Sequence, residues 1–193
     1  MGPPLAAPYG DREVVTHPPN SQGFLLLEML RVLEELGVGL DATGEGAGLV
    51  ARTFAVVSRD RERFLADPRR APVPVEELLA DEHVRALAAR VREGPSRSRD
   101  AEVGRPRRPA RGDTVAVVAA DGDGRAVSII QSILHGFGAG ILEPGTGIVC
   151  QNRGACFTLD PASPNVLEGG KRPAHTLMPV LVPGPAISAR MPC

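Results

Sequence analysis

A threonine at the start of an apolar segment is the residue of this sequence best placed to do chemistry. Gly112, Asp113 and Thr114 lead directly into Val115 and a further run of small apolar residues. A cut between Asp113 and Thr114 would give the threonine a free α-amino group, whose unperturbed pKa is about 7.7–8.0. That amine can accept the hydroxyl proton, so such a threonine acts as a nucleophile without a neighbouring histidine or aspartate. The pattern predicts Thr114 as a nucleophile, and the alternative is that Thr114 is simply a β-branched strand residue.

Helical patterns come first along the chain. Apolar residues at helical spacing and their flanking glycines and prolines predict the helices. We expect them at residues 24–36, 48–65, 75–79 and 82–92. Ser21 and Asp81 are expected to cap the first and the last of these helices.

Strand patterns dominate the second half of the chain. We expect one early strand at 11–16 and later strands at 114–120, 126–134, 147–151 and 175–182. The sequence Asp-Gly-Asp-Gly at 121–124 is typical of a hairpin turn between two of them. Helices followed by strands predict an α+β fold.

Residues 94–111 separate the helical and strand patterns. This segment holds six arginines and three prolines and almost no large apolar side chain. Such a composition is typical of an exposed, mobile linker. A nucleic-acid patch is the alternative, but no aromatic residues or folded basic face accompany the arginines.

Composition excludes several classes of protein. The 193 residues have a formal net charge of -1, so no global field favours nucleic acid or a membrane surface. Apolar residues make up 42%, which suffices for one core, and 22 glycines and 19 prolines indicate many loops. The sequence lacks an apolar run of about 18 residues, which predicts no membrane span, and its start does not resemble a secretory signal.

The cysteines do not predict a disulfide framework or a metal centre. Cys150, Cys156 and Cys193 are the only three. Their number is compatible with a reducing compartment. They form no Cys-x-x-Cys motif and have no histidine cluster beside them, so no metal site is expected.

An ordered series of motifs resembles the γ-glutamyltransferase (glutathione hydrolase) family. It begins with Thr-His-Pro-Pro-Asn-Ser-Gln-Gly at 16–23, Asp60-Arg61 and Ala-Asp-Pro at 66–68. It continues with Gly-Asp-Thr at 112–114, Asp-Gly-Asp-Gly-Arg-Ala-Val at 121–127 and Gln131-Ser132. It ends with Phe-Gly-Ala-Gly-Ile at 137–141, Pro-Gly-Thr-Gly at 144–147, Gln-Asn-Arg-Gly at 151–154 and Gly-Lys-Arg-Pro at 170–173. The resemblance covers residues 10–182.

The resemblance implies the fold of the N-terminal-nucleophile hydrolases. That fold is an αββα sandwich, with two antiparallel sheets between helix layers, and we expect it to be incomplete in this chain. The family precursor cuts itself before the threonine aligned with Thr114, and its large and small segments stay associated. The expected division is 1–93 as the C-terminal part of a large-subunit-like region, 94–111 as the linker, 112–182 as the N-terminal part of a small-subunit-like region, and 183–193 as an aberrant tail.

The resemblance also implies the reaction. It is γ-glutamyl transfer or hydrolysis through an acyl-enzyme on Thr114, with glutathione or other γ-glutamyl amides as the small-molecule substrate. Water or an amine of an amino acid or peptide then takes the acyl group. No metal or organic cofactor, no nucleic acid and no membrane partner is expected. The compartment is unknown, with the cytoplasm preferred.

Further site residues follow from the alignment with the family. Ser132 matches a hydroxyl residue near the nucleophile's amine. Asn152 and Arg153 match polar residues of the glutamyl pocket. His175 and Thr176 match a serine pair that helps to hold the substrate α-carboxylate. Each also has a plain structural explanation, as a strand, turn or edge residue at the surface.

Three departures bear on the substrate. Val115 stands where the family often has a second threonine, and Leu134 replaces a pocket asparagine. Cys156 replaces an aspartate that would pair with the substrate α-ammonium. The pattern is similar to the branch that includes cephalosporin acylases, so a glutaryl-type acylase of the same mechanism is the alternative.

Family segments expected before residue 11 and after residue 182 also bear on activity. The later segment has a Gly-Gly turn whose backbone amides form the oxyanion hole. We therefore expect a chain truncated at both ends, and an inactive remnant with no turnover is a further alternative. A hydrolase that uses His135 or His175 with a serine is disfavoured, because the sequence has no Gly-x-Ser-x-Gly motif.

Overall fold

The computed structural model describes residues 2–38, 44, 46–94 and 114–184. Asp113, most of the expected linker (95–111) and most of the expected tail (185–193) lie outside the described residues. Within the described part, helices and strands are both present, which confirms the expected α+β class. None of the described helices is long and apolar enough to cross a membrane.

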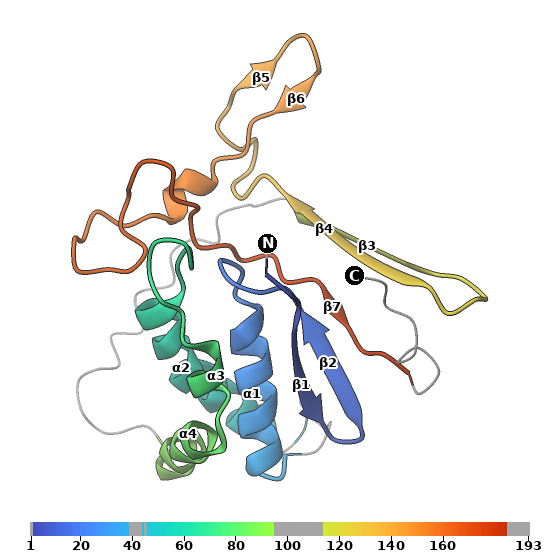
Figure 1. Ribbon diagram of the computed structural model, residues 1–193, viewed down its shortest axis with the longest axis vertical. Coiled ribbons are helices and arrows are strands. Elements are labelled where there is room, and N and C mark those ends of the chain that lie inside the picture. Colours follow the sequence, from blue (N-terminus) through green and yellow to red (C-terminus); the bar gives the residue numbers. More distant parts are fainter. Residues whose placement is uncertain (1, 39–43, 45, 95–113, 185–193) are drawn as a thin grey trace.

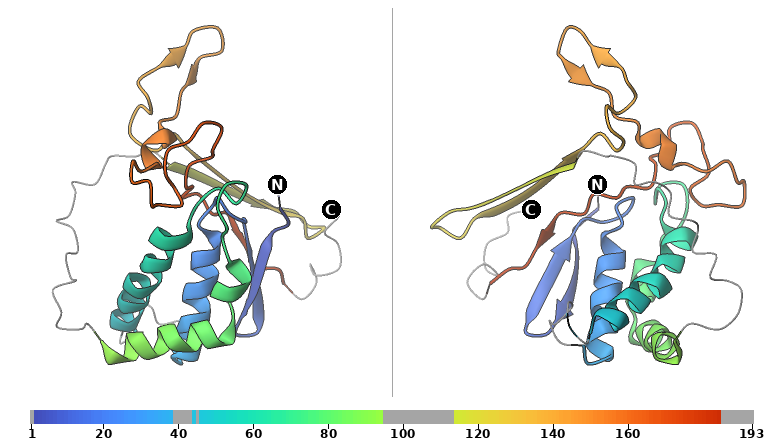
Figure 2. Two further views of the ribbon diagram at one scale, coloured as in Figure 1. Left: turned by 60° about the vertical axis from the view of Figure 1, so that its left-hand side comes forward. Right: turned by 180° about the vertical axis from the view of Figure 1, so that it is seen from behind.

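A small sheet and a group of helices form the body of the molecule (Figure 1). The sheet has the order β1-β2-β7 and consists of β1 (Leu5–Tyr9), β2 (Arg12–Thr16) and β7 (Val180–Leu181), paired antiparallel. Helix α1 (Gly23–Glu35) packs against this sheet. On its other side lie α2 (Ala47–Phe64) and α4 (Asp81–Glu93), with the short α3 (Val75–Leu78) between them in sequence (Figure 2).

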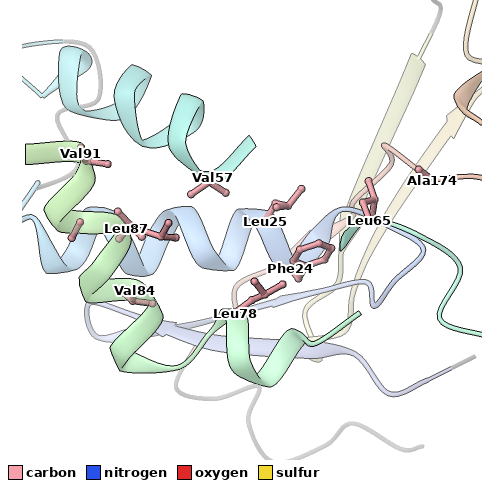
Figure 3. Close-up of a cluster of buried hydrophobic side chains, with 11 residues drawn as sticks. Phe24, Leu25, Val57, Leu65, Leu78, Val84, Leu87, Val91 and Ala174 are labelled. Atoms are coloured by element: carbon pink, nitrogen blue, oxygen red, sulfur yellow. The ribbon is translucent and has the colours of Figure 1, made fainter. Parts of the chain in front are cut away.

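The hydrophobic core lies between the helices. Phe24 and Val32 of α1 are fully buried, and they belong to one cluster with Val57 of α2 and Leu87 and Val91 of α4 (Figure 3). Burial of each such side chain contributes about 1.5–3 kcal/mol relative to exposure. The apolar stripes that predicted these helices are therefore the faces that hold the helical layer together.

The helices agree with their predicted positions to within a residue or two, but both predicted caps are wrong. The N-cap position of α1 is Gln22, and the Ser21 hydroxyl donates instead to the carbonyl oxygen of Leu177, at 2.5 Å. Asp81 is the first residue of α4 rather than its cap, and its carboxylate pairs with Arg31 of α1. In both cases the side chain binds a residue distant in the sequence instead of capping the helix beside it.

Of the strands predicted in the second half, the one at 114–120 is confirmed at its predicted bounds and the others are shorter than predicted. Strands β3 (Thr114–Ala120) and β4 (Ala126–Ser132) form the expected hairpin, which projects from the body (Figure 1). A second small hairpin pairs β5 (Leu142–Glu143) with β6 (Ile148–Val149). Of the strand expected at 175–182, only β7 pairs with β2 along its length. The prediction missed β1 and β5, whose short sequences have no clear apolar alternation.

The segment from residue 170 to 181 runs back along the helical body. Its His175 amide donates to the Asn20 carbonyl oxygen at 2.8 Å, and the Gln22 amide donates to the His175 carbonyl oxygen at 3.0 Å. Closer to β7, the Thr16 hydroxyl donates to the Pro179 carbonyl oxygen at 2.9 Å. These bonds attach the second half of the chain to the loop that precedes α1.

Asp67 strengthens the same attachment with a buried charge. Its side chain is fully buried and accepts charged hydrogen bonds from Arg69 at 2.7 Å and from Arg172 at 2.9 Å. The backbone amides of Arg69 and Arg172 also donate to it, at 3.2 and 2.9 Å. The hydrogen bonds from Arg69, and then those from Arg172, hold the pKa of Asp67 well below its ordinary value of 3.8.

Replacing Asp67 by Asn should lower the free energy of unfolding by about 2 kcal/mol at pH 7, because two arginines lose their anion. In the native protein the lowered pKa contributes stability above about pH 4, and that stability is lost as the pH falls further. The difference between the native chain and Asp67→Asn should therefore shrink below pH 4.

Urea unfolding followed by the circular dichroism of the helices measures both effects. Asp123→Asn is the matched control, because Asp123 is exposed and pairs only with a neighbouring arginine of the hairpin turn. An equal difference between the native chain and Asp67→Asn at pH 7 and pH 3 would contradict the assigned role of this carboxylate.

Candidate active site

Thr114 and Ser132 lie directly opposite each other in the β3–β4 hairpin. They are the first pair of its antiparallel register, and the Thr114 hydroxyl donates to the Ser132 Oγ at 3.0 Å. Thr114 is exposed and Ser132 is half-buried. The predicted nucleophile therefore stands at a strand end with its oxygen already hydrogen-bonded to a second hydroxyl. The expected bond from Ser132 to a free amine of Thr114 stays a prediction.

The chain turns sharply just after Ser132. The Ser132 Oγ also accepts the backbone N–H of Leu134 at 3.0 Å, and Leu134 has a φ of 74°. Positive φ is uncommon for a leucine and is more readily adopted by asparagine, the residue that the family resemblance implies at this position. The sequence difference at Leu134 thus falls on a strained backbone position beside the predicted nucleophile.

Asn152 joins this turn to the next part of the site. Its side-chain oxygen accepts the His135 backbone N–H at 3.1 Å, and its amide nitrogen lies 2.9 Å from His135 Nδ1. Its own backbone N–H donates to the Ile133 carbonyl oxygen at 3.2 Å. Since Ile133 follows Ser132 and Arg153 follows Asn152, these bonds bring the backbone just before Arg153 to the end of β4.

Arg153 is a buried cation at the start of a single 3-10 turn (Arg153–Cys156). The residue is only 4% exposed. Its Nη1 donates to the Thr176 Oγ1 at 3.0 Å, whereas its Nη2 is buried without a hydrogen-bond partner among the described residues. Arg153 forms no ion pair with any carboxylate of the described chain. A buried guanidinium with a free N–H is a ready partner for an anion.

His175 adjoins this arginine, which helps to lower its pKa. Burial, followed by the charge of Arg153, lowers the pKa of His175 below its ordinary value of 6.5. Its Nδ1 accepts the Leu177 backbone N–H at 3.2 Å, so the ring proton is on Nε2. A neutral imidazole of this tautomer can donate one hydrogen bond from Nε2 to a substrate oxygen.

The structure thus gathers the predicted residues into two groups. Thr114 and Ser132 form one group, Arg153, His175 and Thr176 form the other, and Asn152 joins them. Asp113 lies outside the described residues. Sequence reasoning missed Gln151, whose Oε1 accepts the Arg153 backbone N–H.

A cavity of about 520 Å³ lies elsewhere, between the β1–β2 turn and the end of α1, and none of the predicted site residues lines it.

The loop between β4 and β6 depends on a close approach at Gly138. This glycine has a φ of 56°, and a Cβ there would overlap the carbonyl oxygen of Cys150. The Ala139 N–H donates to that same oxygen at 2.8 Å. The loop therefore supports residues 150–153 only if position 138 has no side chain.

Gly138→Ala should loosen this loop and speed amide hydrogen exchange over residues 137–153. Gly140→Ala is the matched control, because Gly140 also has positive φ, at 70°, but a Cβ added there would meet no atom within 4 Å. Hydrogen–deuterium exchange read by mass spectrometry should show the larger loss of protection in Gly138→Ala. Equal losses in both variants would mean that only backbone strain matters at these positions.

Comparisons with known proteins identify the family of this chain. The family model described as Gamma-glutamyltranspeptidase matches residues 1–187. The chain is 36% identical over 185 residues to the glutathione hydrolase-like YwrD proenzyme of Bacillus subtilis, covering 93% of this chain and 33% of that protein. It is 38% identical over 164 residues to the oxamate amidohydrolase proenzyme of Klebsiella pneumoniae, covering 83% and 29% respectively.

The fold of this chain is also similar to that of a solved structure. The cephalosporin acylase of Bacillus halodurans superposes with a TM-score of 0.75 at 32% identity, over 95% of this chain and 32% of that one. The chain spans about a third of the length of the relatives it matches. These matches confirm the resemblance seen in the ordered motifs. The chain belongs to the γ-glutamyltranspeptidase family.

Proposed function

We propose that this chain carries the nucleophile of an amide-cleaving acyl transferase, with Thr114 as nucleophile and γ-glutamyl amides such as glutathione as substrates. The observation that carries the proposal is the position of Thr114 at the head of β3, with its hydroxyl 3.0 Å from the Ser132 Oγ. Family membership supports it, because several relatives are named as proenzymes.

The first step is self-cleavage. The Thr114 Oγ attacks the carbonyl carbon of Asp113, the peptide C–N bond breaks, and the hydroxyl proton passes to the departing Thr114 nitrogen. The product is an ester between the Asp113 carbonyl and the Thr114 oxygen. Water then hydrolyses the ester, which leaves a carboxylate on Asp113 and both a hydroxyl and a free amine on Thr114.

The second step is turnover. The free amine of Thr114 accepts the proton of the Thr114 hydroxyl as Oγ attacks the substrate amide carbonyl. The proton then goes to the leaving amine, and the acyl group remains on Oγ as an ester. Water or an acceptor amine attacks this ester and restores the hydroxyl. Ser132 positions Thr114 Oγ during both steps, since its own Oγ is the hydrogen-bond partner.

The proposed division of the chain follows the cleavage site. Residues 1–93 belong to a large-subunit-like segment, 94–111 to the linker, 112–182 to a small-subunit-like segment, and 183–193 to a divergent tail. Bonds between Asp67 and Arg172, and between Asn20 and His175, would keep the two segments together after cleavage. In the whole αββα sandwich, the hairpin would be covered through Val115, Val117 and Ile129, which are more than half exposed here.

We assign substrate recognition to the second group. Arg153 would bind a substrate carboxylate through its free Nη2, and Thr176 orients the guanidinium through Nη1. His175 would donate from Nε2 to the same carboxylate. Asn152 sets the position of Arg153 by bonding the turn after Ser132.

A second substrate class is favoured by one feature of the pocket. Cys156 stands in place of the aspartate that would pair with a glutamyl α-ammonium, whereas Arg153 can still bind a carboxylate. An acyl group with a carboxylate but no amine, such as a glutaryl side chain, fits that combination. The similarity to an oxamate amidohydrolase and a cephalosporin acylase supports this alternative. A remnant without turnover is the third possibility.

The intact mass of the purified chain, followed over time, tests self-cleavage. We expect two fragments that join between Asp113 and Thr114, and no cleavage in Thr114→Ala. Thr114→Ser should still cleave, because it retains the hydroxyl. Persistence of the uncut native chain, beside an uncut Thr114→Ala, would refute the proposal that this polypeptide is an active enzyme, although it would leave the family membership intact.

Arg153→Gln tests the carboxylate site in the cleaved protein. Loss of a charged hydrogen bond to substrate should raise KM by about 10–100-fold, with a smaller effect on kcat. Arg125→Gln is the matched control, because Arg125 pairs only with aspartates of the hairpin turn. Assays with glutathione and a glutaryl amide, alone and in competition, distinguish the two substrate classes. An unchanged KM for both substrates would exclude Arg153 from the site.

A further inference from the structure

Three ionisable side chains meet inside the helical layer, on three different helices. Glu28 comes from α1, Asp60 from α2 and His83 from α4. The His83 Nε2 lies 3.0 Å from the Glu28 Oε1 and 3.1 Å from the Asp60 Oδ2. One donor atom from each residue lies within 4.8 Å of the others. The cluster is separate from Thr114 and Arg153, which lie on the hairpin and on the 3-10 turn.

One carboxylate oxygen of this cluster is buried without a partner. The Glu28 side chain is fully buried, and its Oε2 forms no hydrogen bond to any described residue. Asp60 is 8% exposed. Most buried polar atoms in proteins are hydrogen-bonded, so an unpartnered oxygen beside two other ligand-type atoms points to a missing partner.

We propose that Glu28, Asp60 and His83 bind a first-row divalent cation, Mn²⁺ or Zn²⁺, which joins α1, α2 and α4. An imidazole nitrogen and two carboxylates are a donor set used for such ions. Octahedral ligands at right angles, each about 2.1 Å from a metal, are about 3.0 Å apart, and tetrahedral ligands are about 3.4 Å apart, so the two nitrogen–oxygen distances suit the octahedral geometry of Mn²⁺ better. The Glu28 Oε2 offers a further donor from the same carboxylate.

Access and charge both suit a cation. The His83 side chain is 31% exposed, so the cluster has a route to solvent. A proton competes with the cation for the Glu28 carboxylate. Burial, followed by the charge of Asp60, raises the pKa of Glu28 to about 9. A divalent cation would replace that proton and neutralise both carboxylates.

The consequence of binding would be structural. The three ligands come from helices whose apolar faces form the main core, and no ligand belongs to the predicted catalytic groups. An ion that binds the folded chain alone raises its stability in proportion to the logarithm of the ion concentration. The catalytic chemistry proposed for Thr114 needs no metal, whether or not an ion binds this cluster.

Titration of the full chain with Mn²⁺ tests the site. The protein is first dialysed against EDTA and then against metal-free buffer at pH 7.5. Loss of the electron paramagnetic resonance signal of free Mn²⁺ measures binding, and circular dichroism measures the melting temperature. Mn²⁺ is the main probe because thiolates, including those of Cys150 and Cys156, bind it weakly. A parallel titration with Zn²⁺ uses isothermal calorimetry.

We expect one saturable site per chain and a higher melting temperature with metal. Glu28→Gln, which keeps the shape of the side chain, and His83→Gln should each weaken binding at least 10-fold. Glu168→Gln is the matched control, since Glu168 is exposed and pairs with Arg70, and it should bind as the native chain does.

Two results would overturn the proposal. The first is the absence of saturable binding of both Mn²⁺ and Zn²⁺ by the native chain, which needs no variant to interpret. The second is equal affinity in the native chain, Glu28→Gln and His83→Gln. Either would mean that Glu28, Asp60 and His83 do not form a metal site.

Discussion

The buried carboxylate of Asp67 is the contact on which the arrangement of the two halves depends. It lies just after α2 and accepts hydrogen bonds from Arg172, 105 residues further along the chain. A charge buried this completely is stable only where donors surround it, and here two guanidinium groups and two backbone amides do so. The segment from residue 170 to 181 is thereby held against the helices, and His175 and Thr176 take their places on it.

Backbone hydrogen bonds then position the residues of the candidate site. The register of β3 and β4 sets Thr114 opposite Ser132, and the Asn152 backbone bond to Ile133 brings the 3-10 turn to the end of that hairpin. Arg153 is then buried against Thr176, which the Asp67 attachment has positioned. A hydroxyl pair and a buried cation with a free N–H result from elements that are weakly structured by themselves. The site is therefore a product of the contacts between segments.

Local sequence signals account for much of the fold. Apolar periodicity located α1, α2 and α4, and the Asp-Gly-Asp-Gly turn located the β3–β4 hairpin, because both signals arise within a few residues. The predicted caps at Ser21 and Asp81 were wrong because distant partners, Leu177 and Arg31, bind those side chains. The strand expected at 175–182 is mostly irregular, since its hydrogen bonds go to the loop before α1 rather than to a long neighbouring strand.

The sequence by itself determined the family, through the order of its motifs, and the placement of Thr114 at the head of a strand. It also marked Arg153, His175 and Thr176 as polar positions. Only the tertiary structure decided that Arg153 is buried with an unpartnered nitrogen, that burial and Arg153 lower the pKa of His175, and that Glu28, Asp60 and His83 meet. A glutamate within a leucine-rich helix hinted at that last cluster, but its partners lie 32 and 55 positions further along the chain. Burial and charge pairing depend on which distant side chains come together, and no local pattern records this.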